Sequence, residues 1–147
     1  MQLSKAGEAL LKGFEQLHLT AYNDDGSAKG VWTIGWGSTS GVTEGLVITL
    51  AQAQARFIRE TGIAVDFLNK ELPGKLLQCE FDATVSLIFN VGVAEFEKSF
   101  MFSYLKSGHM LQAAQEMWSF DHTSGELSKG LMNRRAREVL YFNGATV

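Results

Sequence analysis

Strand-forming residues are concentrated in one early segment of this 147-residue chain, and this is the feature that most constrains its fold. Within Leu17–Trp36, the run HLTAY alternates apolar and polar residues, NDDGSAKG is typical of a turn, and VWTIGW is β-branched and aromatic. We therefore expect a β-hairpin there. The remaining chain has helical periodicity, which predicts an α+β fold with a small sheet lobe beside a larger helical lobe. A cleft between two such lobes is a natural binding site.

Capping residues and glycines mark the predicted helices. Residues 4–14 are expected to form the first helix, because Ser4 can cap it and its apolar residues fall near one face. Thr49 begins a second helical segment with Gln52 as its capping-box partner. Gly62 lies just past the first part of this segment, and the helical pattern continues from there until Pro73. Three later helices are expected to end at Gly92, Gly108 and Gly144.

The length predicts one domain, residues 1–147. We expect a strand-containing lobe of about residues 15–60, and a helical lobe made of residues 1–14 and 61–147. The single cysteine, Cys79, excludes an internal disulfide, and its expected role is that of a small buried apolar residue.

Charge and hydropathy exclude several classes of function. The net charge of −3 provides no basis for non-specific nucleic-acid binding, which depends on Lys and Arg neutralising phosphates. No apolar run approaches the length of a membrane-spanning helix, so stable membrane insertion is not expected. The first residues, MQLSKAGEALLKGFE, lack the apolar core of a signal peptide, which predicts a protein located in the cytoplasm.

Three residues around the predicted hairpin form a candidate hydrolytic site. Glu15 precedes the hairpin, Asp24 lies in or near its turn, and Thr33 lies on the returning strand. Glycoside hydrolysis requires two carboxyl groups in different environments, one protonated and one ionised. A threonine hydroxyl could position the water. The spacing alone is equally compatible with Asp and Gly that only form a turn.

Three segments then resemble one family. FEQLHLTAYND and GVWTIGWG are similar to the active-site signature of phage-type lysozymes, glycoside hydrolase family 24, in which eight residues separate a glutamate from an aspartate and five separate that aspartate from a threonine. FDATVSLIFNVG resembles a second helix of the family, and GLMNRRAREVLYF resembles its final helix. The matches occur in the family's order and extend from about residue 4 to residue 142.

The resemblance implies a role for each matched position. Glu15 corresponds to the general acid, Asp24 to the residue that orients the attacking water or acts as base, and Thr33 to the residue that holds the same water. Arg134 corresponds to the arginine that pairs with the catalytic glutamate. Substrate binding is expected at two further positions, Phe89 and Thr39. Phe89 corresponds to an aromatic residue that lines the cleft, and plain packing in the core is an equally open role for it.

The chain departs from the family pattern in the hairpin. Eight residues instead of five separate Asp24 from Thr33, so the turn contains about three extra residues, and Asp25 competes for the role of Asp24. Ser38 occupies the position of a family histidine that is not one of the three catalytic side chains. We expect altered local stability and retained chemistry.

The implied function is a muramidase that cleaves peptidoglycan between N-acetylmuramic acid and N-acetylglucosamine during phage-induced lysis. The expected mechanism is inverting, with no metal or other cofactor. The protein is expected to be a monomer that waits in the host cytoplasm and needs a holin or similar pore to reach the cell wall. Two alternatives remain, namely a lytic transglycosylase, which can work with one glutamate, and a catalytically silent peptidoglycan-binding module.

Overall fold

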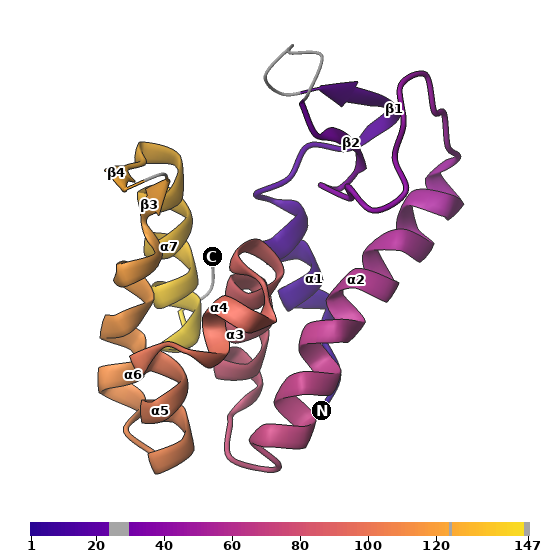
Figure 1. The fold of residues 1–147 in the computed structure, drawn as a ribbon. Coiled ribbons are helices and arrows are strands. Elements are labelled where there is room, and N and C mark those ends of the chain that lie inside the picture. The colour runs from indigo at the N-terminus through magenta and orange to yellow at the C-terminus, as the bar shows by residue number, and fades with distance from the viewer. Residues whose placement is uncertain (24–29, 124, 146–147) are drawn as a thin grey trace.

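A computed structural model describes residues 1–23, 30–123 and 125–145 of the chain (Figure 1). The helices are α1 (Lys5–Lys12), α2 (Leu50–Glu71), α3 (Gln78–Val91), α4 (Val93–Glu97), α5 (Phe100–Ser107), α6 (Met110–Glu116), the short 3₁₀ helix η1 (Met117–Phe120) and α7 (Lys129–Phe142). The strands are β1 (His18–Asn23), β2 (Trp32–Gly35), β3 (His122–Thr123) and β4 (Glu126–Leu127). The fold is α+β, as predicted, with a small sheet and a larger helical lobe.

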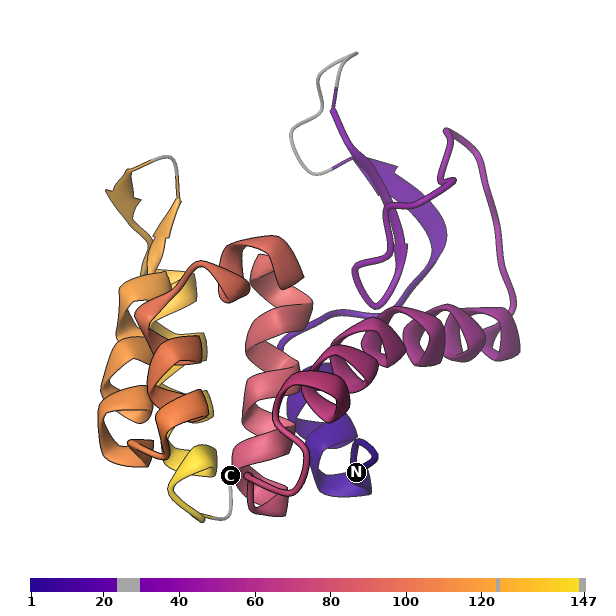
Figure 2. The ribbon, with the colours of Figure 1, turned by 60° about the horizontal axis from the view of Figure 1, so that its bottom comes forward.

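The β1–β2 hairpin lies at the N-terminal end of α2, on the opposite side of α3 from α5, α6 and α7 (Figures 1 and 2). The two strands are antiparallel, with Tyr22 opposite Thr33. The other edge of β1 is covered by the segment before α2, because the amide of Ile48 donates to the carbonyl oxygen of Leu19 at 2.9 Å. A covered edge leaves fewer unpaired backbone groups on this small sheet.

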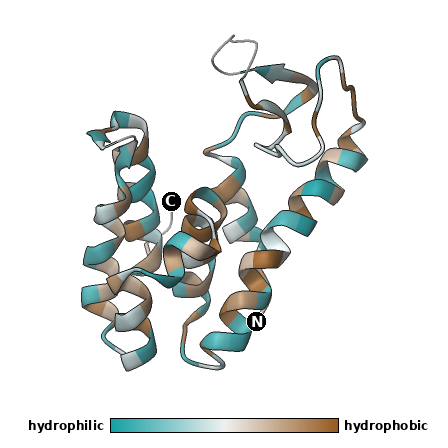
Figure 3. Ribbon diagram, in the orientation of Figure 1, coloured by the Kyte–Doolittle hydropathy of each residue, from teal (hydrophilic) through white to brown (hydrophobic). Residues whose placement is uncertain are grey.

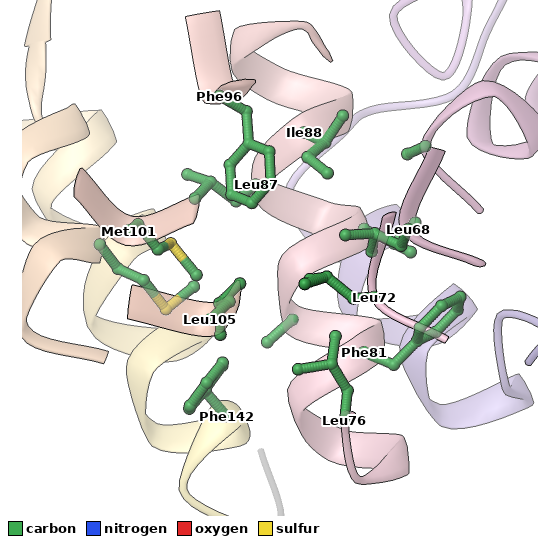
Figure 4. Packing of buried hydrophobic residues seen from close by; sticks show 14 of the residues in the cluster. Leu68, Leu72, Leu76, Phe81, Leu87, Ile88, Phe96, Met101, Leu105 and Phe142 are labelled. Carbon is green, nitrogen blue, oxygen red and sulfur yellow. The ribbon is translucent and has the colours of Figure 1, made fainter. Parts of the chain in front are cut away.

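The main core is built around α3, which contributes buried residues along most of its length (Figure 4). Hydrophobic residues occur along α3 and along the helices around it (Figure 3). Residues of α2, α3, α5 and α7 belong to one buried cluster, including Leu68, Val85, Leu87, Met101, Leu105 and Phe142. A second, smaller cluster lies under the sheet and contains Ala21, Ile34, Ile48 and Ala53. Trp36 packs against both clusters and so connects the sheet lobe to the helical lobe.

The predicted caps are present. Ser4 accepts a hydrogen bond from the Gly7 amide at 3.0 Å, and Thr49 forms the expected capping box with Gln52. The helical pattern was predicted to continue past Gly62 as far as Pro73, and α2 runs through Gly62 to Glu71. Glycine costs only about 1 kcal/mol in a helix interior, and the buried apolar residues that follow Gly62 outweigh this.

Two details of the helical lobe differ from what the sequence predicted. The segment predicted as one helix up to Gly108 is divided into α4 and α5, because Ser99 caps the second helix by accepting from the Phe102 amide. The β3–β4 hairpin before α7 was not predicted. Its strands have two residues each, which is too short for an alternating pattern to be visible.

Candidate active site

Glu15 lies just beyond the end of α1, in the connection that leads into β1. Its Oε1 accepts a hydrogen bond from Nη1 of Arg134 at 2.7 Å, across 119 positions of sequence. The Glu15 side chain is 23% exposed, whereas that of Arg134 is 8% exposed. A carboxyl that is anchored on one side and partly open to solvent can meet a ligand while keeping a fixed orientation.

Arg134 is held by contacts on every side of its guanidinium. In addition to Glu15, Nε donates to Oε1 of Glu138 at 3.1 Å, and Nη2 donates to the backbone carbonyl of Ser86 at 3.3 Å. The guanidinium also lies over the Phe14 ring, 4.7 Å from its centroid, and Arg137 lies 4.8 Å from the same centroid. These contacts fix α7 against α3 and against the segment that carries Glu15.

Glu138 is a fully buried acid at the centre of this network. Its Oε1 also accepts from the hydroxyl of Ser86 at 2.6 Å, and its Oε2 lies 3.0 Å from Nε of Arg135. Burial raises the pKa of Glu138, although both arginines and the Ser86 hydroxyl oppose this effect. Burial likewise lowers the pKa of Arg135 to about 10. Each of these buried groups is therefore partly compensated by the charge of the other.

A pocket of about 400 Å³ brings together Thr39 and Phe89, the two predicted substrate-binding residues, and Glu15 is close to one of its lining residues, Gly37, without lining it. Gly37 has a φ of +86°. A Cβ atom at Gly37 would lie 3.3 Å from Oε2 of Glu15, so glycine permits both the turn and the close approach. The rest of the lining is mostly apolar and comprises Ser40, Glu60, Ile63, Ala64, Ile88, Gly92 and Val93.

The remaining predicted site residues lie in the hairpin. Thr33 is buried on β2, and its hydroxyl donates to the carbonyl oxygen of Val31 at 3.3 Å. Asp24 and its competitor Asp25 lie outside the described residues. The predicted roles of Asp24 and Thr33 toward a water molecule therefore remain predictions.

Ser38, which replaces the family histidine, is buried between the sheet and α2. Its hydroxyl donates to Oε2 of Glu60 at 2.8 Å, and its backbone exchanges two hydrogen bonds with Ile34. Glu60 also lines the pocket that contains Thr39. The serine thus keeps a polar connection between the sheet lobe and the long helix at the pocket wall.

The sequence analysis did not assign a role to Glu138, Ser86 or Arg135. A signal for Glu138 was present, because a glutamate four residues after Arg134 lies on the same face of a helix. No comparable signal identified Ser86, which belongs to a different helix. Among the residues that the structure describes, no cluster of His, Cys, Asp and Glu could hold a metal ion. In the same residues, no helix has the length and hydropathy required to cross a membrane.

Comparison with known proteins agrees with this architecture. The phage lysozyme family profile matches residues 12–138. An endolysin of Bacillus phage PZA is 40% identical over 99% of this chain, and an endolysin of Acyrthosiphon pisum secondary endosymbiont phage 1 is 36% identical over 99%. The muramidase domain of SpmX from Asticaccaulis excentricus superposes with a TM-score of 0.86 and 31% identity, covering 98% of this chain and 99% of that domain.

This chain belongs to the phage lysozyme family. It matches 57% of the length of the phage PZA endolysin and the full length of the endosymbiont phage endolysin.

Proposed function

We propose that this protein is a peptidoglycan hydrolase, specifically a muramidase that cleaves between N-acetylmuramic acid and N-acetylglucosamine during phage-induced lysis. The observation that carries the proposal is the ion pair of Glu15 and Arg134, together with the approach of Glu15 to Gly37 in the wall of the pocket that Thr39 and Phe89 line. Membership of the phage lysozyme family, together with relatives named endolysin and muramidase, supports the same chemistry.

In the proposed reaction, Glu15 is the general acid. It transfers its proton to the glycosidic oxygen as the bond between that oxygen and the anomeric carbon breaks. A water molecule attacks the anomeric carbon from the opposite face and gives a proton to Asp24, while Thr33 helps to hold that water. Proton exchange with solvent then restores both carboxyl groups. The apolar part of the pocket, including Phe89, would pack against the sugar rings.

The proposal includes finer assignments that rest on the resemblance. The chain is placed in glycoside hydrolase family 24, and its reaction is taken to invert the anomeric carbon. Inversion requires the carboxyl groups of Glu15 and Asp24 to stand about 6.5–9.5 Å apart, with room for a water between them. The protein is proposed to act as a monomer on the cell wall, after leaving the host cytoplasm through a holin or similar pore.

The decisive experiment compares wild type with Glu15→Gln on purified peptidoglycan. We expect at least a 100-fold loss of turnover, because glutamine cannot donate the proton, with a melting temperature within a few degrees of wild type. Glu97→Gln, which changes an exposed carboxyl on α4, is the matched control and should retain full activity. Mass spectrometry should find reducing N-acetylmuramic acid ends. Anhydro-sugar ends would indicate a lytic transglycosylase, and inactive wild type would indicate a binding module.

The assignment of the second carboxyl is tested separately. Asp24 keeps the family spacing from Glu15, so Asp24→Asn should abolish most turnover and Asp25→Asn should leave it largely intact. The extra hairpin residues would then lie between Asp24 and Thr33. Exchanged phenotypes of the two variants would show that Asp25 has the catalytic role.

A further inference from the structure

Trp36 lies where the sheet lobe meets the helical lobe, directly before a residue of the pocket wall. Around it, Ile34 and Ser38 exchange two backbone hydrogen bonds of 2.9 Å, so the turn between them is a compact unit. The next residue, Gly37, lines the pocket, and a Cβ atom there would lie 3.3 Å from Oε2 of Glu15. A displacement of Trp36 therefore displaces Gly37, and with it one part of the pocket wall.

A series of aromatic rings joins Trp36 to a second part of the pocket wall. The rings of Trp36 and Phe57 form an edge-to-face pair with centroids 5.7 Å apart, and the centroids of Phe57 and Phe89 are 5.9 Å apart. Phe57 is buried on α2, whereas Phe89 on α3 lines the pocket. Because tilted and edge-to-face rings attract at these distances, one packed set of rings connects the two parts of the wall.

The ammonium group of Lys12 on α1 lies over this set of rings. Its Nζ is 3.9 Å from the ring centroid of Trp36 and 4.9 Å from that of Phe57. Two acceptors hold it there, since Nζ donates to Oε1 of Glu8 at 2.6 Å and to Oε1 of Gln54 at 2.5 Å. The Lys12 side chain is 22% exposed, and a cation over an indole face attracts more strongly as water is removed. Lys12 thus ties the Trp36 ring to both α1 and α2.

We propose that Lys12 is a positioning residue for substrate binding, acting through Trp36. By holding the indole against α1 and α2, it keeps the two parts of the pocket wall at the spacing that a glycan strand requires. Glu15 is held separately by Arg134, so Lys12 should affect the affinity for substrate more than the chemical step. This inference rests on the proposed glycosidase function and deepens it, because it names a residue that sets the shape of the substrate pocket.

The test compares kcat and KM of wild type, Lys12→Met and Lys12→Arg on soluble peptidoglycan glycan strands, well below the melting temperature of each protein. Methionine keeps an unbranched apolar side chain over Trp36 and removes only the charge. KM should rise by about threefold to tenfold, because only molecules with both parts of the wall in place bind the strand, while kcat stays within about twofold of wild type. Lys12→Arg should return KM to within about twofold of wild type, because a guanidinium also binds over an indole and can donate to both acceptors.

Lys106→Met is the matched control, because the Nζ of Lys106 lies 4.9 Å from the ring centroid of Phe102 within α5, and the described residues that line the pocket include none from α5. It should leave KM unchanged. In a Trp36→Leu background, Lys12→Met should change KM by less than about twofold, because the ring through which Lys12 acts is gone.

Three results would overturn the inference. They are a KM of Lys12→Met within twofold of wild type, an equal rise of KM in Lys12→Arg, and a full rise of KM in the Trp36→Leu background. Inactive wild type would instead refute the proposed function. The inference is then decided by the calorimetric Kd of the same strands, which Lys12→Met should weaken by the same factor. A wild type that neither cleaves nor binds the strands would refute both.

Discussion

Two fully buried carboxyl groups, Asp82 on α3 and Glu138 on α7, are stabilised in different ways. Asp82 accepts hydrogen bonds from neutral groups, namely the Ser4 amide and hydroxyl, the Gln78 side chain and the Tyr141 hydroxyl. Glu138 is instead compensated by the charges of two arginines.

The two buried carboxyl groups therefore have different roles. Asp82 anchors one helix to its neighbours, whereas Glu138 belongs to the charged network that includes Glu15. The hydrogen bonds of Asp82 attach the start of α1 to α3 and to the end of α7, and they bring no positive charge to the site. Of the two arginines around Glu138, Arg134 also contacts Glu15, so the buried network is joined directly to the proposed general acid. One carboxyl secures a helix, and the other is connected to the proposed chemistry.

The largest expected effect is that of Glu138→Ala on stability. This change leaves the buried guanidinium of Arg135 without its carboxylate and removes one of the two carboxylates of Arg134, so it should lower the free energy of unfolding by about 3–5 kcal/mol in a urea titration. A loss below about 1 kcal/mol would show that the arginines find other partners, and the contrast with Asp82 would then disappear.

Asp82→Asn is expected to cost about 2–3 kcal/mol, because the amide presents its own N–H groups to a site made of donors. The loss should appear in urea unfolding, while kcat on peptidoglycan measured well below the melting temperature stays within twofold of wild type. A large fall in kcat would mean that the anchoring of α1 also controls the position of Glu15.

Gly7→Ala tests how closely α1 approaches Asp82. A Cβ atom at Gly7 would lie 2.5 Å from Cγ of Asp82, so the helices must separate, at a cost of about 2 kcal/mol by thermal or urea unfolding. Gly62→Ala is the matched control, because nothing lies within 4 Å of the added atom in α2. It should stabilise by about 0.5–1 kcal/mol. Equal effects of the two substitutions would contradict the observed packing.

A double-mutant cycle on Glu15 and Arg134 measures the link between the charged network and the pocket. Because the pair is partly buried at 2.7 Å, the coupling in unfolding free energy should be about 1–2 kcal/mol with Glu15→Gln and Arg134→Gln. Strictly additive effects would mean that the buried network does not act on Glu15 through this contact.

The partly exposed ion pair of Glu8 and Lys12 should have the smallest effect on the free energy of unfolding. The hydrogen bond from Lys12 lowers the pKa of Glu8, but the Glu8 side chain is 37% exposed and water screens the pair. Glu8→Gln should therefore cost at most about 0.5 kcal/mol at pH 7. Because the folded pKa is lowered, this contribution is present above the ordinary glutamate pKa of about 4.3 and is lost as the pH falls through the folded value. Unfolding curves of both proteins at pH 7 and pH 3 would test the sign.

Local chemistry was sufficient to predict much of the fold. The Ser4 cap, the Thr49 capping box and the hairpin follow from short-range hydrogen bonding and side-chain alternation, and the structure contains all three. The helical continuation past Gly62 toward Pro73 was also predicted, and α2 ends at Glu71. The β3–β4 hairpin was not predictable in this way, because strands of two residues are too short to show alternation.

The sequence by itself determined the α+β division and the family resemblance, because both depend on residue types at characteristic spacings. The pairing of Glu15 with Arg134 was expected only because the resemblance implied it. Only the tertiary structure revealed that Arg134 is shared with Glu138 and that Ser86 completes the network. The physical reason is that compensation between buried charges depends on distance and on the exclusion of water. Both are fixed only when α3 and α7 pack together.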